Sequence, residues 1–241
     1  MDNELLLLSK NDIPFLEAQV NIHQPTISEI SFIGEENFFS GCQFLNFSKR
    51  MISVEDKTDL ENKSDFEIFM SIMCSPEKIE YKNHALMVLT LLFPTYQIKI
   101  TPNELILLND KGMARINNLN FDAFKDILVS MFGLDELGTG GGYNPIGKRA
   151  EKIAEKLQKA KNRKEQDKGN QKVAILSRYI SILTVGEAKD MNDFLQYTVF
   201  QLKDEFKRYQ MKQSFDMYVQ AKMAGAKDLD EVDNWMDDIH P

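Results

Sequence analysis

The sequence of 241 residues is poor in the side chains that build disulfide frameworks and metal centres. Its two cysteines, Cys42 and Cys74, stand alone in apolar stretches, so we expect two reduced, buried thiols, with a disulfide between them as the alternative. The three histidines, His23, His84 and His240, have no cysteine or histidine partner at metal-ligand spacing. The sequence therefore predicts no metal site.

Long apolar runs are also missing. The run at 85–93 is about half as long as a membrane-spanning helix, and the N-terminus is acidic where a secretory signal would be basic. We therefore expect a cytoplasmic chain without a membrane or targeting segment. The net charge of −8 is unevenly spread, because residues 148–172 contain ten basic and four acidic residues. That segment carries +6 and the remainder −14, which makes it a candidate for binding an acidic partner.

The first half of the chain has the pattern of an α+β domain, which we place at residues 1–137. Strands are predicted for Leu5–Leu8 and Phe15–Ile22, and Thr26 and Glu29 have the spacing of a capping box at a helix start. Apolar periodicity and turn residues give the remaining elements. These are helices at 65–74, 77–93 and 122–132, and a small antiparallel meander at 96–101, 104–108 and 113–117.

The second half is predicted to be entirely helical, so that helices dominate overall. We divide it into a Gly-rich linker (138–144), a basic amphipathic helix (145–172) and a C-terminal helical domain (173–241). Helices are expected at 173–183, at 192–224 as one long helix, and after Asp228. The basic helix has Asn144-Pro145 at its start and a narrow apolar stripe that includes Ile153 and Leu157.

The glycine run raises the question of nucleotide binding, because residues 142–149 match a phosphate-binding P-loop except at the last position. Arg149 replaces the hydroxyl that would hold Mg²⁺, and a helix is expected before the loop where a P-loop enzyme has a buried strand. We therefore interpret Gly138, Gly140, Gly141 and Gly142 as a hinge. No catalytic residue or cofactor is predicted, and nucleotide binding through Gly142–Lys148 is kept as a remote alternative to a protein that is not an enzyme.

The basic helix has three interpretations: a solvated connector, a helix that docks on protein, and a nucleic-acid contact. Glu155 and Lys159 form a favourable pair along the helix, which supports the first. No aromatic residue that could stack on a base occurs between Tyr143 and Tyr179. Nucleic acid is therefore the least supported partner.

The C-terminal helices carry large apolar side chains on more than one side. Most of them are expected to form a helical-bundle core, and some to form a surface that accepts a partner segment. A homo-oligomer is also left open. The predicted partner-binding residues are Ile153, Leu157, Phe206, Tyr209, Phe215, Tyr218, Trp235 and Met236.

Three stretches, IHQPTISEISFIGEENFF (22–39), YNPIGKRAEKIAEKLQKAK (143–161) and the ending from 195 to 240, resemble tail-morphogenesis proteins of long-tailed phages or prophages of Gram-positive bacteria. Within that group the chain is most similar to tail assembly chaperones. The resemblance implies a non-enzymatic viral protein of the host cytoplasm that binds the helical tape measure protein, or the tail tube protein, during virion assembly. The alternative it leaves is a structural tail or baseplate component retained in the virion.

Overall fold

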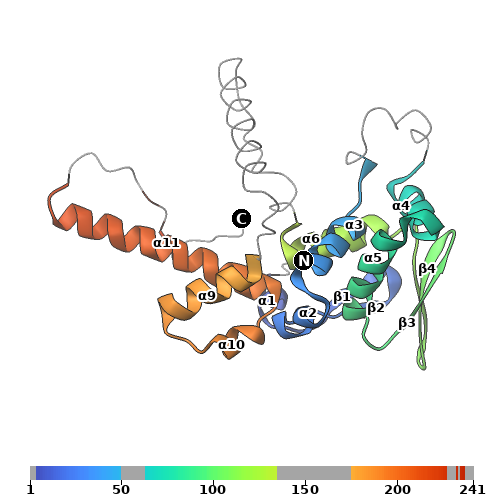
Figure 1. The fold of residues 1–241 in the computed structure, drawn as a ribbon, viewed down its shortest axis with the longest axis horizontal. Helices are drawn as coiled ribbons and strands as arrows, with labels where there is room; N and C mark the ends of the chain where they lie inside the picture. Colours follow the sequence, from blue (N-terminus) through green and yellow to red (C-terminus); the bar gives the residue numbers. More distant parts are fainter. Residues whose placement is uncertain (1–3, 50–62, 135–174, 227–231, 233, 237–241) are drawn as a thin grey trace, which may run out of the picture.

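Among the residues that the structure describes, the short strands all lie before residue 117, and the part from residue 175 to 223 consists mainly of helices (Figure 1). The computed structural model describes residues 4–49, 63–134, 175–226, 232 and 234–236. This architecture confirms the predicted helix-dominated α+β class. Within the described ranges, no helix is both long and apolar enough to cross a bilayer.

The bounds of the elements follow the chain from α1 to α11. The first half contains α1 (Glu4–Leu8), β1 (Ile13–Phe15), η1 (Leu16–Ala18), β2 (Val20–Ile22), α2 (Ile27–Ile33), α3 (Glu35–Leu45), α4 (Asp65–Cys74), η4 (Pro76–Lys78), α5 (Ile79–Leu92), β3 (Gln97–Thr101), β4 (Glu104–Asn109), β5 (Gly112–Ile116) and α6 (Phe121–Phe132). The second half contains α9 (Ile175–Glu187), α10 (Met191–Leu195) and α11 (Val199–Met223).

Capping boxes start three of these helices. In each, the N-cap hydroxyl accepts a hydrogen bond from the backbone N–H three residues later, and the side chain there accepts one from the N-cap N–H. The pairs are Thr26 and Glu29 for α2, Ser64 and Glu67 for α4, and Thr198 and Gln201 for α11. An N-cap of this kind stabilises a helix by about 1 kcal/mol, so local sequence fixes where these helices begin.

The strands form two antiparallel sheets. Strands β1 and β2 make a hairpin in which Ile13 lies opposite Ile22, both buried. Strands β3, β4 and β5 make the predicted meander, with β4 in the centre. Leu105 and Leu107 of β4 point into the core while their neighbours along the strand are only partly covered, which is the alternation of a sheet with one buried face.

Helices α3 and α5 approach closely at Gly41. A Cβ at this position would lie 2.4 Å from the carbonyl oxygen of His84 and 2.6 Å from Cγ2 of Val88, so only glycine fits. The core as a whole is rich in aromatic rings that are almost entirely shielded from solvent. They are Phe15, Phe38, Phe69, Phe93, Phe121, Phe124, Phe132 and Phe194.

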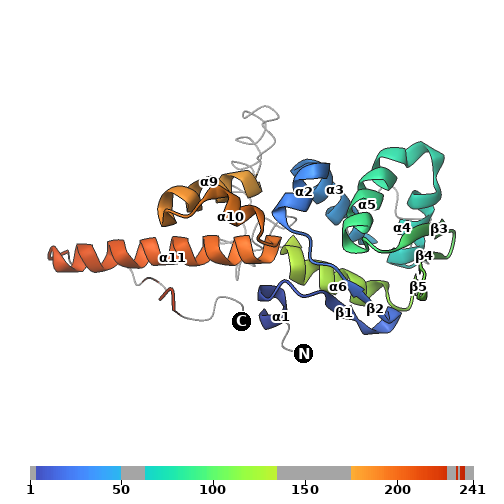
Figure 2. The same cartoon turned by 90° about the horizontal axis from the view of Figure 1, so that it is seen from below.

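The core continues from the first half into the C-terminal helices. Phe194, Val199 and Leu202 are fully buried in the same cluster as the residues of α3, α5 and α6. Figure 2 shows α9 and α10 together on one side of α11, and both views show the C-terminal part of α11 projecting beyond them. The first turns of α11 are thus built into the body of the protein, and its last turns are not.

Several predicted elements are wrong near the N-terminus. Leu5–Leu8, expected as a strand, lies in the helix α1, in keeping with the high helix propensity of leucine. Phe15–Ile22, expected as one strand, is split by η1, after which Gln19 adopts a left-handed conformation (φ 55°) that turns the chain back into the β1–β2 hairpin. Helix α3 has no counterpart among the predicted elements, although its sequence, EENFFSGCQFL, is helical throughout.

The single long helix predicted for 192–224 is also wrong, because the chain breaks between α10 and α11. Thr198 leaves the helical conformation to cap α11, and the Tyr197 carbonyl accepts a hydrogen bond from the backbone N–H of Ile27 at 2.8 Å. The thiol prediction is half right. Both cysteines are free and Cys42 is buried, which raises its pKa, but Cys74 is exposed at the end of α4.

Candidate protein-binding surface

Helix α11 is held in place by a junction with the N-terminal segment. Thr26 and Thr198, the N-caps of α2 and α11, form an isolated antiparallel bridge. The Gln201 side-chain amide donates to the Leu8 carbonyl at 2.6 Å, and the Lys10 ammonium donates to the Gln196 carbonyl. The N-termini of α2 and α11 therefore hold each other in position, and the direction of α11 follows from the fold of the first half.

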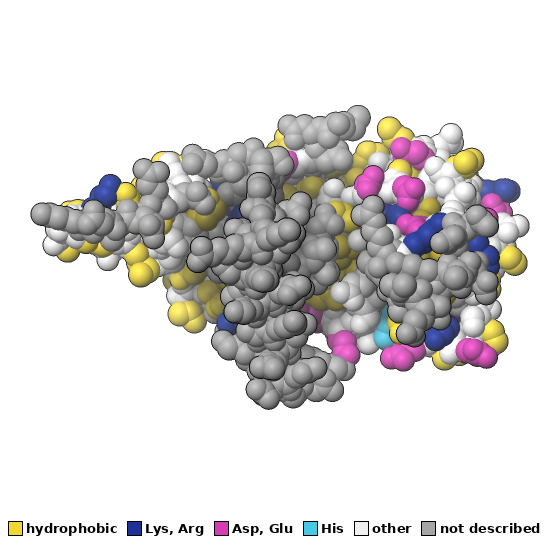
Figure 3. Space-filling view, turned by 90° about the horizontal axis from the view of Figure 1, so that it is seen from above, with side chains coloured by type: hydrophobic (Ala, Val, Ile, Leu, Met, Phe, Trp, Pro, Cys, Tyr) yellow, Lys and Arg dark blue, Asp and Glu magenta, His cyan; other side chains and the backbone are white. Residues whose placement is uncertain are grey.

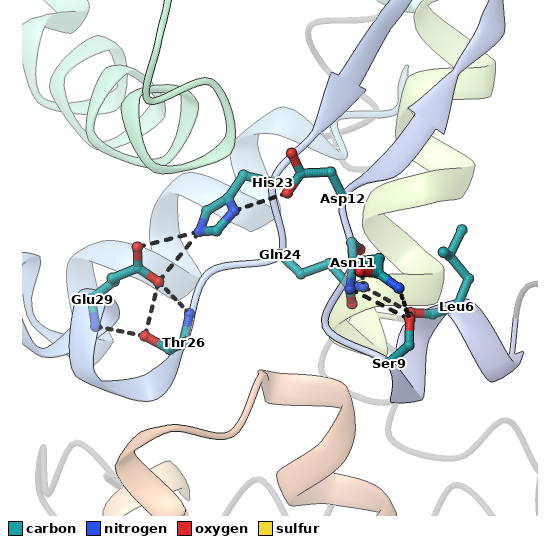
Figure 4. Close-up of polar contacts among 8 residues, drawn as sticks. All are labelled: Leu6, Ser9, Asn11, Asp12, His23, Gln24, Thr26 and Glu29. Atoms are coloured by element: carbon teal, nitrogen blue, oxygen red, sulfur yellow. Dashed lines mark hydrogen bonds and ion pairs between the residues drawn. The ribbon is translucent and has the colours of Figure 1, made fainter.

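A polar cluster supports the N-terminal side of this junction (Figure 4). His23 lies between two carboxylates, with Nδ1 3.1 Å from Asp12 and Nε2 3.2 Å from Glu29. Partial burial alone would raise the pKa of Glu29, but hydrogen bonds from the Thr26 N–H and hydroxyl, together with His23, outweigh it and lower the pKa. The buried Gln24 amide donates to the carbonyls of Leu6 and Asn11, closing the loop between α1 and β1.

The inner face of α11, which we define as Val199, Leu202, Phe206 and Tyr209, packs against the body and α9. The rings of Phe206 and Tyr179 stack with centroids 3.9 Å apart and planes at 12°. The ring of Tyr209 fills the space beside Gly186, where a Cβ would lie 2.3 Å from the Tyr209 hydroxyl oxygen. Phe206 and Tyr209 therefore form the seam of a helical hairpin between α9 and α11.

An ion-pair cluster at the C-terminal end of α9 also fastens this helix to α11. Lys189 Nζ lies 2.6 Å from Glu205 and 2.8 Å from Glu187. Partial burial would lower the pKa of Lys189, but these two carboxylates outweigh it and raise the pKa. The pKa of Glu187 is raised by its burial and by the neighbouring carboxylate of Glu205, whereas the pKa of Glu205, despite burial, is lowered chiefly by Lys189.

The distal face of α11, which we define as Arg208, Met211, Phe215, Tyr218 and Lys222, points the other way. At about 100° per residue its mean direction lies about 180° from that of the inner face. No residue of α11 beyond Asp204 is fully buried. Phe215 and Tyr218 are half-buried, and the nearby Met217 and Met223 are 68% and 83% exposed. The end of the helix thus presents apolar side chains on several sides.

The distal half of α11 is also locally basic. Residues 207–223 contain four basic residues and one acidic residue, Asp216, which pairs with Lys212 at 2.7 Å. The Lys222 ammonium lies over the ring of Tyr218, 4.6 Å from its centroid. Figure 3 shows hydrophobic and basic side chains together where this end of the helix projects. Apolar area with interspersed cations suits an amphipathic segment that carries acidic residues.

The predicted site residues are distributed over several environments. Phe206 and Tyr209 belong to the hairpin seam, Phe215 and Tyr218 to the distal face, and Trp235 is half-buried while Met236 is exposed. Ile153, Leu157 and the hinge glycines lie outside the described residues, as do the linker, the basic helix, the P-loop-like stretch and the helix start at Asp228. Partner binding by these residues stays a prediction.

The predicted partner-binding residues omit Arg208, Met211 and Lys222 of the distal face, and also Val219 next to it. Val219 is exposed beside Phe215, and Arg208 pairs with Asp204 one turn earlier on α11. The signal was present, since positions 208, 211, 215, 218 and 222 repeat the same three-four spacing as the inner face. In the part of the chain that the structure describes, no three His, Cys, Asp or Glu side chains form a group that could hold a metal ion.

Comparison with known proteins adds one finding about this region. Residues 164–240, which include α9, α10 and α11, match a family model described as the YomV second domain, a family named after a protein of a Bacillus prophage. The match indicates a protein of phage or prophage type. No curated protein and no solved structure matches the chain. The helical hairpin and the projecting end of α11 are therefore the parts of the molecule that carry the phage-type likeness.

Proposed function

We propose that this chain is a non-enzymatic protein-binding factor of phage tail morphogenesis, a chaperone that holds a helical tail protein of the tape measure type, or the tail tube protein, until assembly. The observation that carries the proposal is the projecting half of α11. It presents methionine and aromatic side chains on several sides, and it lies within the region of phage-type likeness.

The chemistry of the surface favours a helical partner. Met211, Met217 and Met223 are unbranched side chains that adapt to different partner shapes. These methionines lie on different sides of α11, so a partner that covers them together with Phe215 and Tyr218 has to place helical segments on more than one side of its projecting end. A long helical tail protein exposes many such apolar stripes before assembly, and covering them would keep it from aggregating.

The test is capture by the full chain in phage-infected cells. A tagged chain should recover a long helical tail protein and should be absent from purified virions. The variant Met217→Glu with Met223→Glu should lose the partner, because charges replace apolar side chains at exposed positions where the fold does not depend on them. Lys111→Glu, in the exposed β4–β5 turn, is the matched control and should still recover it.

The outcomes separate this proposal from its alternatives. Finding the chain inside virions would make it a structural tail or baseplate component and would overturn the chaperone proposal. Capture that is unaffected by the methionine changes would move the binding surface away from α11. A thermal shift with nucleotide that Lys148→Ala removes would revive nucleotide binding through Gly142–Lys148 and would contradict a purely protein-binding role.

A further inference from the structure

The distal face of α11 lies opposite α9, yet most of it is not fully open to solvent. Arg208, Met211, Phe215 and Tyr218 are all half-buried. In both Figure 1 and Figure 2 the short described stretch near the C-terminus lies on this side of α11, away from α9. A direct hydrogen bond joins the two, since Nη1 of Arg208 donates to the Trp235 carbonyl at 3.2 Å.

The residues around that contact are complementary in charge. Residues 228–238 contain six acidic and no basic residues, whereas residues 207–223 of α11 carry a net charge of +3. The same C-terminal segment includes the apolar side chains Leu229, Val232, Trp235 and Met236. Of these, Val232 and Trp235 are half-buried and Met236 is exposed. Apolar residues with acidic neighbours are what an apolar, basic helix face accepts.

The chain between α11 and Trp235 is long enough for this contact. After α11, Gly225 adopts a positive φ of 87°, and the N–H of Ala226 donates to the Ala221 carbonyl at 3.0 Å, which reverses the chain at the helix end. Arg208 lies about 22 Å back along α11 from Met223 at 1.5 Å per residue. The 12 residues from Met223 to Trp235 span up to about 40 Å when extended, so they reach Arg208 with length to spare.

We propose that the acidic C-terminal segment, residues 228–238, is an intramolecular ligand of the distal face of α11, anchored by Trp235 beside Arg208. It occupies the surface in the free protein, and an acidic amphipathic segment of a partner would compete for the same face. The docking of the segment stands independently of the proposed function, and only this competition rests on it.

The experiment uses Trp235 as a probe, because it is the only tryptophan in the chain. The emission of the full chain is compared with that of a free peptide of residues 226–241. Docking predicts blue-shifted emission and slower quenching by acrylamide in the full chain. The variant R208E/K222E should move both toward the free-peptide values, because it reverses two charges on the distal face. Lys111→Glu reverses one charge far from α11 and should leave the emission and the quenching unchanged.

A second variant guards against misfolding, since Arg208 also pairs with Asp204. Phe215→Ser removes apolar area from the distal face without touching any ion pair and should shift the emission in the same direction, with far-UV circular dichroism unchanged. Emission and quenching equal to those of the free peptide in the wild-type chain, or unaffected by both variants, would overturn the docking.

The competition is tested by removing the segment. A chain ending at Ala226 should capture its phage partner severalfold more strongly than the full chain at equal concentration. Equal or weaker capture would overturn the competition while leaving the fluorescence result to decide the docking. If neither the full chain nor the shortened chain captured a partner, the result would count against the proposed function. Failure of the competition and failure of the proposed function are therefore distinguishable.

Discussion

The contact between α3 and α5 at Gly41 makes a prediction whose sign depends on the structure. In an isolated helix, replacing glycine by alanine stabilises the helix by about 1 kcal/mol. At Gly41 the new methyl group would lie 2.4 Å from the His84 carbonyl oxygen and 2.9 Å from its carbonyl carbon, which are backbone atoms that cannot rotate away. Overpacking a core in this manner costs about 1 to 3 kcal/mol, and the backbone contacts place this case at the upper end.

We therefore expect Gly41→Ala to lower the free energy of unfolding by about 2 kcal/mol, the overpacking cost less the gain in helix propensity. Urea denaturation followed by circular dichroism measures it. Gln43→Ala, at an exposed position of the same helix, is the control and should change stability by less than about 0.5 kcal/mol. A Gly41→Ala protein as stable as the wild type, or more stable, would refute the close approach of α3 and α5.

Two further predictions concern ionisable groups. The pKa of Glu29 is lowered in the folded protein, so its contribution to stability is present above about pH 4.3 and is lost as pH falls through the folded value. Glu29→Gln should therefore be less stable than wild type near neutral pH but lose less stability between about pH 5 and pH 3, as measured by urea unfolding across that range. If the free energy of unfolding fell equally with pH in both proteins, the stabilisation of the Glu29 carboxylate by Thr26 would be contradicted. Lys189→Met leaves Glu187 and Glu205 facing each other and should lower stability by about 1 kcal/mol, with a smaller loss in high salt, in thermal unfolding. An unchanged melting temperature at low salt would show that the cluster does not hold α9 to α11.

Much of the fold could be predicted because capping residues, apolar periodicity and turn residues determine these elements locally. The Thr26 and Glu29 capping box, the helix at Asp65–Cys74 and the three-stranded meander all appear where capping residues, periodicity and turns place them. These signals act within a few residues along the chain, so they survive folding. The same is true of the α+β class of the first half and of the helices between residues 175 and 223.

Two of the wrong predictions come from tertiary contacts. The four-three spacing runs from Leu195 through Val199 and Leu202 without interruption, so periodicity cannot show that the chain breaks at Thr198. The break depends on Ile27, which is far away in the sequence and whose backbone N–H donates a hydrogen bond to the Tyr197 carbonyl. Likewise, an apolar stretch around Cys74 predicts burial, but only packing decides which side of α4 faces the core.

The candidate surface was predictable in part. Aromatic residues on several sides of one helix indicated more apolar area than a single core contact can cover, and the structure resolves that area into two opposite faces. The position of α9 decides which residues belong to each face. Tyr179 stacks on Phe206 and Gly186 lies against Tyr209, so these two aromatic residues belong to the inner face. That assignment needs the hairpin, since the sequence alone gives no partner for either ring.

The most direct test of the central claim is amide hydrogen exchange of the full chain, alone and with the tail protein recovered by capture. A partner that lies along the projecting half of α11 stabilises that helix, so exchange should slow at residues 211–223 and stay unchanged in the β3–β5 sheet. Protection confined to the sheet or to the first half of the chain, with none at residues 211–223, would contradict the claim that α11 is the binding surface.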